Sequence, residues 1–249
     1  AETLAISLTQ EFPTHQFAWK VLGAVLKQTG RIADSLIPMQ KSAQLTPQDA
    51  EAHSNLGNTL KDLGRLDEAE ASYNQAIELK PDYAEAYSNL GVTLQTLERL
   101  DEAEASFTKA IELKPDYPEA HYNLGVTLQA LGKLDEAETS YNQAIALKPG
   151  HAEAHGNLGV TLQALARLDE AEASYKQAIA LRPGFFEAHS NLGNIFKELG
   201  RVNEAEASFT QAIALKPDFV EAHYNLGSTL KELGRLEEAE VSLGKAIAL

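Results

Sequence analysis

A column of primary amides recurs along this chain of 249 residues at a fixed interval. A primary amide offers hydrogen-bond donors and an acceptor together, matching the groups that a peptide backbone presents. An evenly spaced column of amides therefore predicts a surface that holds an extended polypeptide with little regard for its sequence. The alternative is that the amides bond only to neighbouring helices. The column consists of Asn55, Asn89, Asn123, Asn157, Asn191 and Asn225, each 34 residues after the one before.

A second column carries imidazoles, which raise the question of a metal or catalytic site. One zinc ion needs its ligands within about 2 Å, whereas neighbouring helices pack about 8–10 Å apart. We therefore expect this column to fill a bulky position between helices. His151 and His155 lie four residues apart, but a third ligand and an HExxH motif are missing from the sequence. The column holds Trp19, His53, Tyr87, His121, His155, His189 and His223.

Other signals of catalysis are equally scarce in the sequence. It has no cysteine, no glycine-rich phosphate loop and no nucleophile elbow. No grouping of serine, histidine and aspartate stands outside the repeating pattern. We predict no catalytic residue, no metal site, no cofactor and no enzyme activity for this chain.

The interval of 34 residues organises nearly the whole chain, and a period of this length is typical of a solenoid. Leu-Gly follows every asparagine of the column. Most units then carry an alanine, an aromatic residue, a second alanine and a closing proline, as at Ala69, Tyr73, Ala76 and Pro81. The segment AEAHSNLGNTLKDLG has apolar or small residues three and four apart, which predicts an amphipathic helix, and LDEAEASYNQAIELK predicts a second. Each unit is therefore a pair of antiparallel helices, and the predicted fold class is all-α.

Glycine and proline mark the ends of these predicted helices. Gly64 and its equivalents end the first helix, while Pro81 and its equivalents end the second. Glu98 and Ala166 stand where other units have the turn glycine, at a cost of about 1 kcal/mol if the turn needs a positive φ. Pro38 lies inside a predicted second helix, which we expect it to kink.

This pattern resembles the tetratricopeptide repeat family, which combines a bulky residue, Leu-Gly, Ala, an aromatic residue, Ala and Pro over about 34 residues. The resemblance implies an α-solenoid, a right-handed superhelix whose first helices line a concave groove and whose second helices cover the convex face. Related bacterial arrays are similar, and the asparagine column resembles the asparagine ladder in the repeat domain of the O-linked N-acetylglucosamine transferase. The predicted units are a partial helix at 1–15, a degenerate repeat at 16–49, repeats at 50–83, 84–117, 118–151, 152–185 and 186–219, and a truncated repeat at 220–249.

The resemblance also places other side chains in the groove, where they vary from unit to unit. The middle units are the least polar, which predicts a partner segment with an apolar or uncharged centre. A chaperone-binding clamp needs lysine and arginine at an early groove position, where this chain carries Glu51 and its equivalents. The predicted groove residues beside the asparagines are Val92, Val126, Val160, Tyr122 and Tyr224.

Composition limits the class of partner. With 36 acidic and 21 basic residues, the formal net charge is −15, which disfavours nucleic acids and anionic membrane surfaces. No apolar run reaches the ~20 residues that a membrane-spanning helix needs. We therefore predict a cytoplasmic, non-catalytic scaffold that binds a protein or peptide.

Two further interpretations concern the end of the chain. The array is alternatively the recognition or oligomerisation arm of a larger transferase, because the last unit stops at Leu249 before its proline. Self-association through the terminal repeats is also predicted, because Leu243-Gly244 replaces the aromatic position and leaves apolar surface for another copy.

Overall fold

The computed structural model describes residues 2–249, and the regular structure in this range consists of fifteen α-helices without a strand. This confirms the predicted all-α class. The first helices of the pairs are α2 (Gln16–Gln28), α4 (Ala50–Asp62), α6 (Ala84–Thr96), α8 (Pro118–Ala130), α10 (Ala152–Ala164), α12 (Phe186–Glu198) and α14 (Val220–Glu232). The second helices are α1 (Glu2–Glu11), α3 (Ile32–Leu45), α5 (Leu66–Leu79), α7 (Leu100–Leu113), α9 (Leu134–Leu147), α11 (Leu168–Leu181), α13 (Val202–Leu215) and α15 (Leu236–Ala248).

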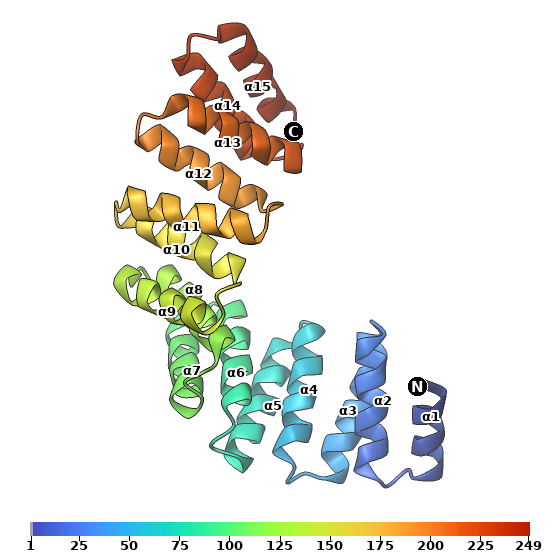
Figure 1. Cartoon of the computed structure of the whole chain (residues 1–249). Coiled ribbons are helices and arrows are strands. Elements are labelled where there is room, and N and C mark those ends of the chain that lie inside the picture. Colours follow the sequence, from blue (N-terminus) through green and yellow to red (C-terminus); the bar gives the residue numbers. More distant parts are fainter. Residues whose placement is uncertain (1) are drawn as a thin grey trace. The chain divides into compact units, whose positions relative to one another are not determined.

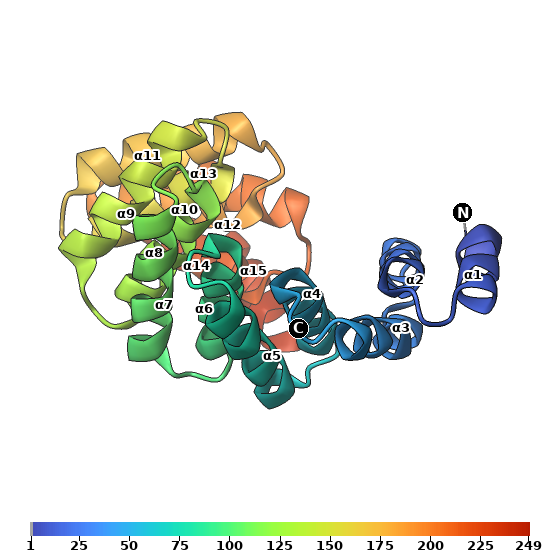
Figure 2. The same ribbon diagram turned by 90° about the horizontal axis from the view of Figure 1, so that it is seen from below.

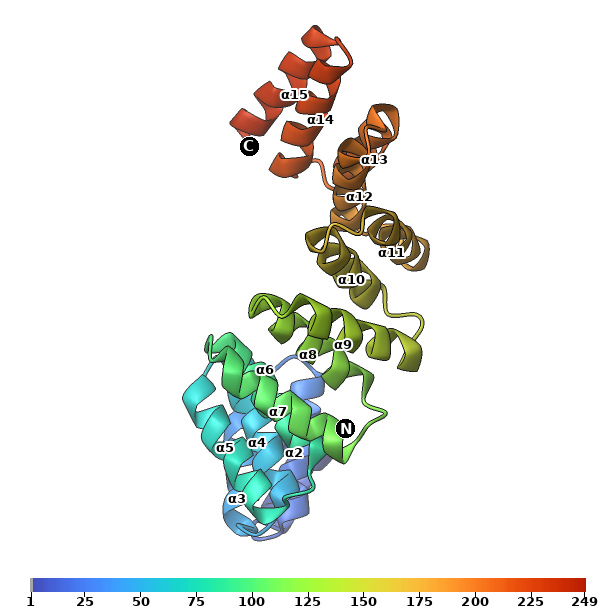
Figure 3. The same cartoon turned by 90° about the vertical axis from the view of Figure 1, so that its left-hand side faces the viewer.

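The chain divides into two compact units, Ala1–Thr127 and Leu128–Leu249, and the division falls within α8. In the first unit α2 packs against α3, α4 against α5 and α6 against α7, as Figures 1 and 2 show. The second helices α3 and α5 also pack against the first helices that follow them. In the second unit the pairs α10/α11, α12/α13 and α14/α15 follow one another in the same manner (Figure 3). Each unit is thus a stack of helix pairs, the arrangement of an α-solenoid.

The turn inside each pair ends the first helix with a residue in the left-handed region. Gly64 has a φ of 73°, and its N–H donates to the carbonyl of Lys61 at 2.9 Å. The N–H of Arg65 donates to the carbonyl of Leu60 at 2.9 Å, which completes a Schellman motif. Glu98 and Ala166 adopt the same conformation, with φ values of 60° and 58°. The turn therefore needs a positive φ, and these two residues carry the strain that glycine avoids.

The core of each pair forms where the two backbones approach closely. A β-carbon at Gly57 would lie 2.7 Å from the Cε1 atom of Tyr73, whose side chain is fully buried. Ala69 and Ala76, on the same helix as Tyr73, are fully buried as well. The Tyr73 hydroxyl donates to the Oδ1 atom of Asn58 at 2.8 Å, so the buried ring keeps its polar end paired. Leu-Gly and the two alanines recur because any larger side chain there would separate the helices.

The pair α2/α3 departs from this pattern at two positions. Met39 takes the place of the aromatic residue, and a β-carbon at Gly23 would lie 2.8 Å from its Cε atom. The unbranched Met side chain thus fills the space of the ring. Helix α3 continues through Pro38 to Leu45, so the proline does not end this helix.

Candidate functional site

The six asparagines of the column lie in the middle of the first helices, and all six side chains are half-buried. We call the asparagines of each unit its asparagine face: Asn55, Asn89 and Asn123 in the first unit, and Asn157, Asn191 and Asn225 in the second. Five of the six backbone carbonyls accept a hydrogen bond from a threonine hydroxyl four residues later. These threonines are fully buried, so they hold the backbone below the asparagine face. They are Thr59, Thr93, Thr127, Thr161 and Thr229.

The amides of the asparagine face differ in their hydrogen bonding. Asn225 donates through Nδ2 to the Oδ1 atom of Asn194 at 3.1 Å, so its amide is tied to the neighbouring first helix. This is the kind of contact that the structural alternative predicts. Four other amides are bonded to no group among residues 2–249, although each is only half-exposed. These four are Asn55, Asn89, Asn123 and Asn191.

A row of glutamines beside the asparagine face links successive first helices, a role that sequence reasoning missed. Gln95 donates to the Thr127 hydroxyl at 2.7 Å and to the carbonyl of Asn123 at 3.2 Å. Gln129 accepts from the hydroxyl of Tyr141 at 2.8 Å and from that of Thr161 at 3.3 Å. The glutamines recur at the same 34-residue spacing as the tyrosines. This shared spacing could have indicated their role. These amides are therefore engaged inside the array.

The predicted valine and tyrosine neighbours occupy mixed surroundings. Val92, Val126 and Val160 are all half-buried, and Val92 packs against a core cluster of the first unit that includes Tyr73. Tyr122 is half-buried, and the side chain of Tyr224 is 60% exposed.

Other repeats have a serine at the position of Tyr122 and Tyr224, and these serines are buried. Ser54 and Ser190 are almost fully buried. Binding of a partner by Tyr122 and Tyr224 stays a prediction.

The imidazole column has a structural contact that explains its residue types. Trp19 donates its Nε1–H to the carbonyl of Pro13 at 2.8 Å, and His53 contacts the carbonyl of Pro47 through Nε2 at 3.0 Å. A carbonyl only accepts, so the histidine Nε2 carries the proton, as the indole nitrogen does. The same contact joins His121, His155, His189 and His223 to the prolines six residues earlier. The column therefore joins each first helix to the connection that precedes it.

Metal binding has no support in this column. Within residues 2–249, no three His, Asp or Glu side chains are placed to hold a metal ion. Burial lowers the pKa of His155, and the charge of nearby His151 lowers it further, while the bond to Pro149 opposes the shift. The imidazole is thus held neutral at physiological pH.

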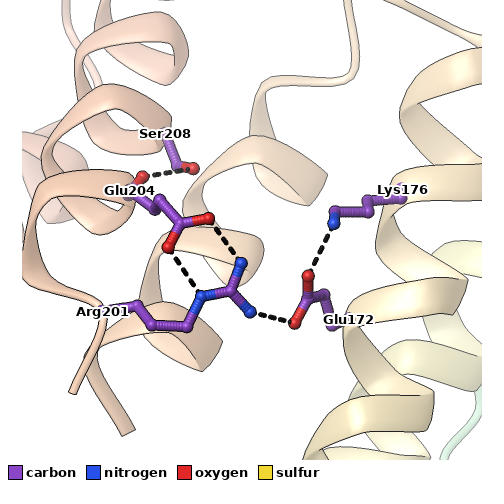
Figure 4. A network of polar contacts seen from close by, with 5 residues as sticks. All are labelled: Glu172, Lys176, Arg201, Glu204 and Ser208. Carbon is purple, nitrogen blue, oxygen red and sulfur yellow. Dashed lines mark hydrogen bonds and ion pairs between the residues drawn. The ribbon is translucent and has the colours of Figure 1, made fainter. Parts of the chain in front are cut away.

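A network of arginines connects successive second helices, as Figure 4 shows for Arg201. The guanidinium of Arg201, the residue that precedes α13, binds both oxygens of Glu204 on α13 and an oxygen of Glu172 on α11 at 2.6 Å. Lys176 approaches Glu172 at 2.6 Å from the other side. Hydrogen bonds from Arg201 lower the pKa of Glu204. The acidic runs that sequence analysis treats as a solvated face therefore also join helix pairs.

We call these contacts the arginine bridges. Arg99 binds Glu70 and Glu102, Arg167 binds Glu138 and Glu170, and Arg235 binds Glu206 and Glu238. Arg65 pairs with Glu68 in its own helix, while the residue 29 positions before it is Leu36 instead of glutamate. The joint between α3 and α5 thus lacks a bridge of this type.

Comparison with known families decides the identity of these stacked pairs. Residues 39–249 match the tetratricopeptide repeat model described as the cilia and flagella-associated protein 70 C-terminal domain. The chain belongs to this tetratricopeptide repeat family. No curated protein matches the repeat array in sequence. Among residues 2–249, the array has no helix with the length and apolar character needed to cross a membrane.

Solved structures of other tetratricopeptide repeat proteins resemble the array. YrrB, described as having an unusual peptide-binding site, is 27% identical with a TM-score of 0.65, and the match covers 74% of this chain and 95% of YrrB. MamA is 25% identical with a TM-score of 0.61, covering 64% of this chain and 93% of MamA. A chain of the APC/C hetero-tetramer Cut9-Hcn1 is 19% identical with a TM-score of 0.75, covering 92% of this chain and 45% of that one. This last likeness shows the shared fold alone.

Proposed function

We propose that the array is a non-catalytic scaffold that binds an extended polypeptide along the asparagine face. The observation that carries this proposal is that the side-chain amides of Asn55, Asn89, Asn123 and Asn191 are half-buried and hydrogen-bonded to no group among residues 2–249. Half-buried amides retain unused donors and acceptors, which a peptide unit satisfies. The solved structure of YrrB, a relative by fold, is described as having a peptide-binding site, which supports the same class of partner.

The spacing of the amides supports an extended ligand. First helices in stacked pairs lie about 8–10 Å apart, and an extended chain rises about 3.3 Å per residue. One amide would therefore meet about every third residue of a bound segment. Val92 and Val126 in the first unit and Val160 in the second supply apolar contact beside the amides, so the segment preferred by each unit is uncharged next to these valines.

Selection from a library of displayed twelve-residue peptides tests this proposal. We expect peptides selected on the native array to lose at least about tenfold in affinity when all six asparagines become alanine, because several hydrogen bonds are lost. Alanine is the better helix former, so the variant keeps its fold. The matched control replaces Asn74 and Asn142, which are exposed on α5 and α9, and should bind as the native array does. Equal binding by the six-alanine variant would refute the proposal.

Self-association through the last pair is a second candidate, supported by exposed apolar side chains. Leu236 is 63% exposed, Val241 60% and Ile247 87%, all on α15. Light scattering over a wide concentration range should show a dimer, and Val241→Lys should abolish it. A strict monomer at every concentration would exclude this candidate.

The predicted cytoplasmic location stays a prediction.

A further inference from the structure

One cation on the first helices lacks the partner that its position normally provides. The residues at the position of Lys61 in other repeats contact the next first helix. Gln95 donates to Thr127 at 2.7 Å, and Lys197 donates to Ser228 at 3.1 Å. The ammonium group of Lys61 makes no hydrogen bond or ion pair within residues 2–249, although the residue is half-buried. A half-buried ammonium group without an acceptor has lost hydration that nothing in the array replaces.

The residues on the neighbouring helix explain why Lys61 has no acceptor. Lys197 finds Ser228 and also Glu232, at 3.2 Å, which lie 31 and 35 residues later. At the same sequence separations from Lys61 stand Val92, which has no polar side-chain atom, and Thr96, which carries no charge where Glu232 is anionic. Burial lowers the pKa of Lys61, and the charge of Lys27 lowers it further, while Asp62 acts in the opposite direction.

Lys27 adds a second cation at this place. Its ammonium group on α2 lies 2.8 Å from a carboxylate oxygen of Asp62 on α4, and the two side chains are 25% and 34% exposed. The charges of Lys27, Lys61 and Asp62 sum to one positive charge, in a chain whose formal net charge is −15. One uncompensated positive charge suits a monoanion, whereas a phosphate dianion would leave net negative charge beside Asp62.

We propose that Lys61, with Lys27, forms a binding position for one carboxylate of the segment that occupies the asparagine face. This inference rests on the proposed function, because Asn55 and Lys61 belong to the same helix, α4. The carboxylate comes from an acidic side chain or from the C-terminus of the segment. Lys61 lies at the opposite end of α4 from Glu51. The negative charge of Glu51 repels a carboxylate from the early groove position. The bound segment therefore carries its acidic group toward α2 and α4, and its uncharged centre beyond them.

Carbon-13 NMR of the lysine side chains tests the position directly. The probes are N-acetylglutamate N-methylamide, which has a side-chain carboxylate, N-acetylalanine, which has a terminal one, and the neutral N-acetylglutamine N-methylamide. We expect the Cε signal of Lys61 to shift and saturate with at least one carboxylate probe and to ignore the neutral one. Lys231, an exposed lysine in the same register, is the internal control. An unmoved Lys61 signal, or one that moves in parallel with Lys231, would overturn the inference.

Three variants give the inference a second readout. Lys61→Met should abolish saturable binding of the carboxylate probe, while Lys231→Met should leave it unchanged. Asp62→Asn frees Lys27 and should tighten the apparent Kd about fivefold, the effect of one partly exposed ion pair. Weaker binding by Asp62→Asn, in a variant that melts as the native array does, would contradict the inference.

These outcomes separate the inference from the proposed function. The small probes report on Lys61 whether or not a polypeptide binds. Saturable carboxylate binding together with no peptide selected by the array would refute the proposed function alone. Peptide selection that depends on the asparagines, with no response of Lys61, would refute the carboxylate position alone.

Discussion

Ala166 offers a test of backbone strain that no side-chain contact complicates. It holds the turn between α10 and α11 with a φ of 58°, where five other turns have glycine with φ values of 72–78°. A β-carbon at any of those five glycines would have no atom within 4 Å, so packing does not contribute. The left-handed conformation costs an L-residue roughly 1–2 kcal/mol. Glycine loses part of this advantage, about 0.4–1 kcal/mol, through the greater freedom of the unfolded chain. Ala166→Gly should therefore stabilise the turn by about 1 kcal/mol.

Hydrogen exchange is the appropriate assay, because repeat arrays open locally and need not unfold in one step. The reporter is the N–H of Arg167, which donates to the carbonyl of Leu162 at 2.9 Å across the turn. Its protection should rise about fivefold, the factor that corresponds to about 1 kcal/mol. The reverse substitution, Gly132→Ala at a φ of 75°, should lower protection of the equivalent turn by a similar factor. Lower protection in Ala166→Gly, or a change of the same sign in both variants, would refute this reasoning.

Three further predictions concern the packing and charges of the array. Gly159→Ala should destabilise the second unit by about 2 kcal/mol in urea titration, because the new β-carbon would lie 2.7 Å from the buried ring of Tyr175. Ser190→Ala should stabilise it by about 1 kcal/mol in the same assay, because the buried Ser190 hydroxyl has no hydrogen-bond partner among residues 2–249. Acid should lower the thermal midpoint. A carboxylate whose pKa is lower in the folded than in the unfolded state stabilises the fold at pH values above its unfolded pKa of about 4.3. This stabilisation is lost as the pH falls through the folded pKa. The carboxylates concerned are Glu102, Glu170, Glu204 and Glu238, whose pKa values are lowered by the arginines of the bridges.

Each of these predictions has a matched control. Gly150→Ala places a β-carbon in open space and should leave urea stability nearly unchanged. Ser208→Ala, in the same unit, removes a buried hydroxyl that donates to the carbonyl of Glu204 at 2.9 Å and should not stabilise it, so a stabilising effect there would contradict the account of Ser190. Glu204→Gln should reduce the acid sensitivity between pH 5 and 3, and an unchanged pH profile would show that the arginine bridges do not carry it.

Several features of the fold could be predicted from local sequence. The period of 34 residues indicates stacked pairs because each amphipathic helix must bury an apolar stripe against its neighbour. The strain at Glu98 and Ala166 could be expected from the glycines at equivalent turns, because backbone conformation at a turn is a local property. The close approach at Gly57 and Tyr73 follows from the pairing of one very small and one large residue in every unit.

Contacts between successive pairs depend on side-chain atoms that a repeat pattern does not locate. The histidines were expected to fill space, but their Nε2 atoms bind proline carbonyls. The glutamines at 95 and 129 link first helices through contacts with threonines on the next helix. The binding roles of the asparagine face and its valine and tyrosine neighbours stay predictions, because an unbound array does not show which unused amides a partner would satisfy.

The sequence by itself determined the repeat, the helix pairs and the positions of the turns, because periodic burial and backbone conformation are set by residues close together in the chain. Only the tertiary structure decided which polar groups are already paired. The side-chain amide of Asn225 is bonded to Asn194, whereas that of Asn55 is bonded to nothing in the described chain. Lys197 finds acceptors where Lys61 finds Val92. These differences arise because a hydrogen bond needs atoms about 3 Å apart, and that distance is set by the stacking of one helix pair on the next.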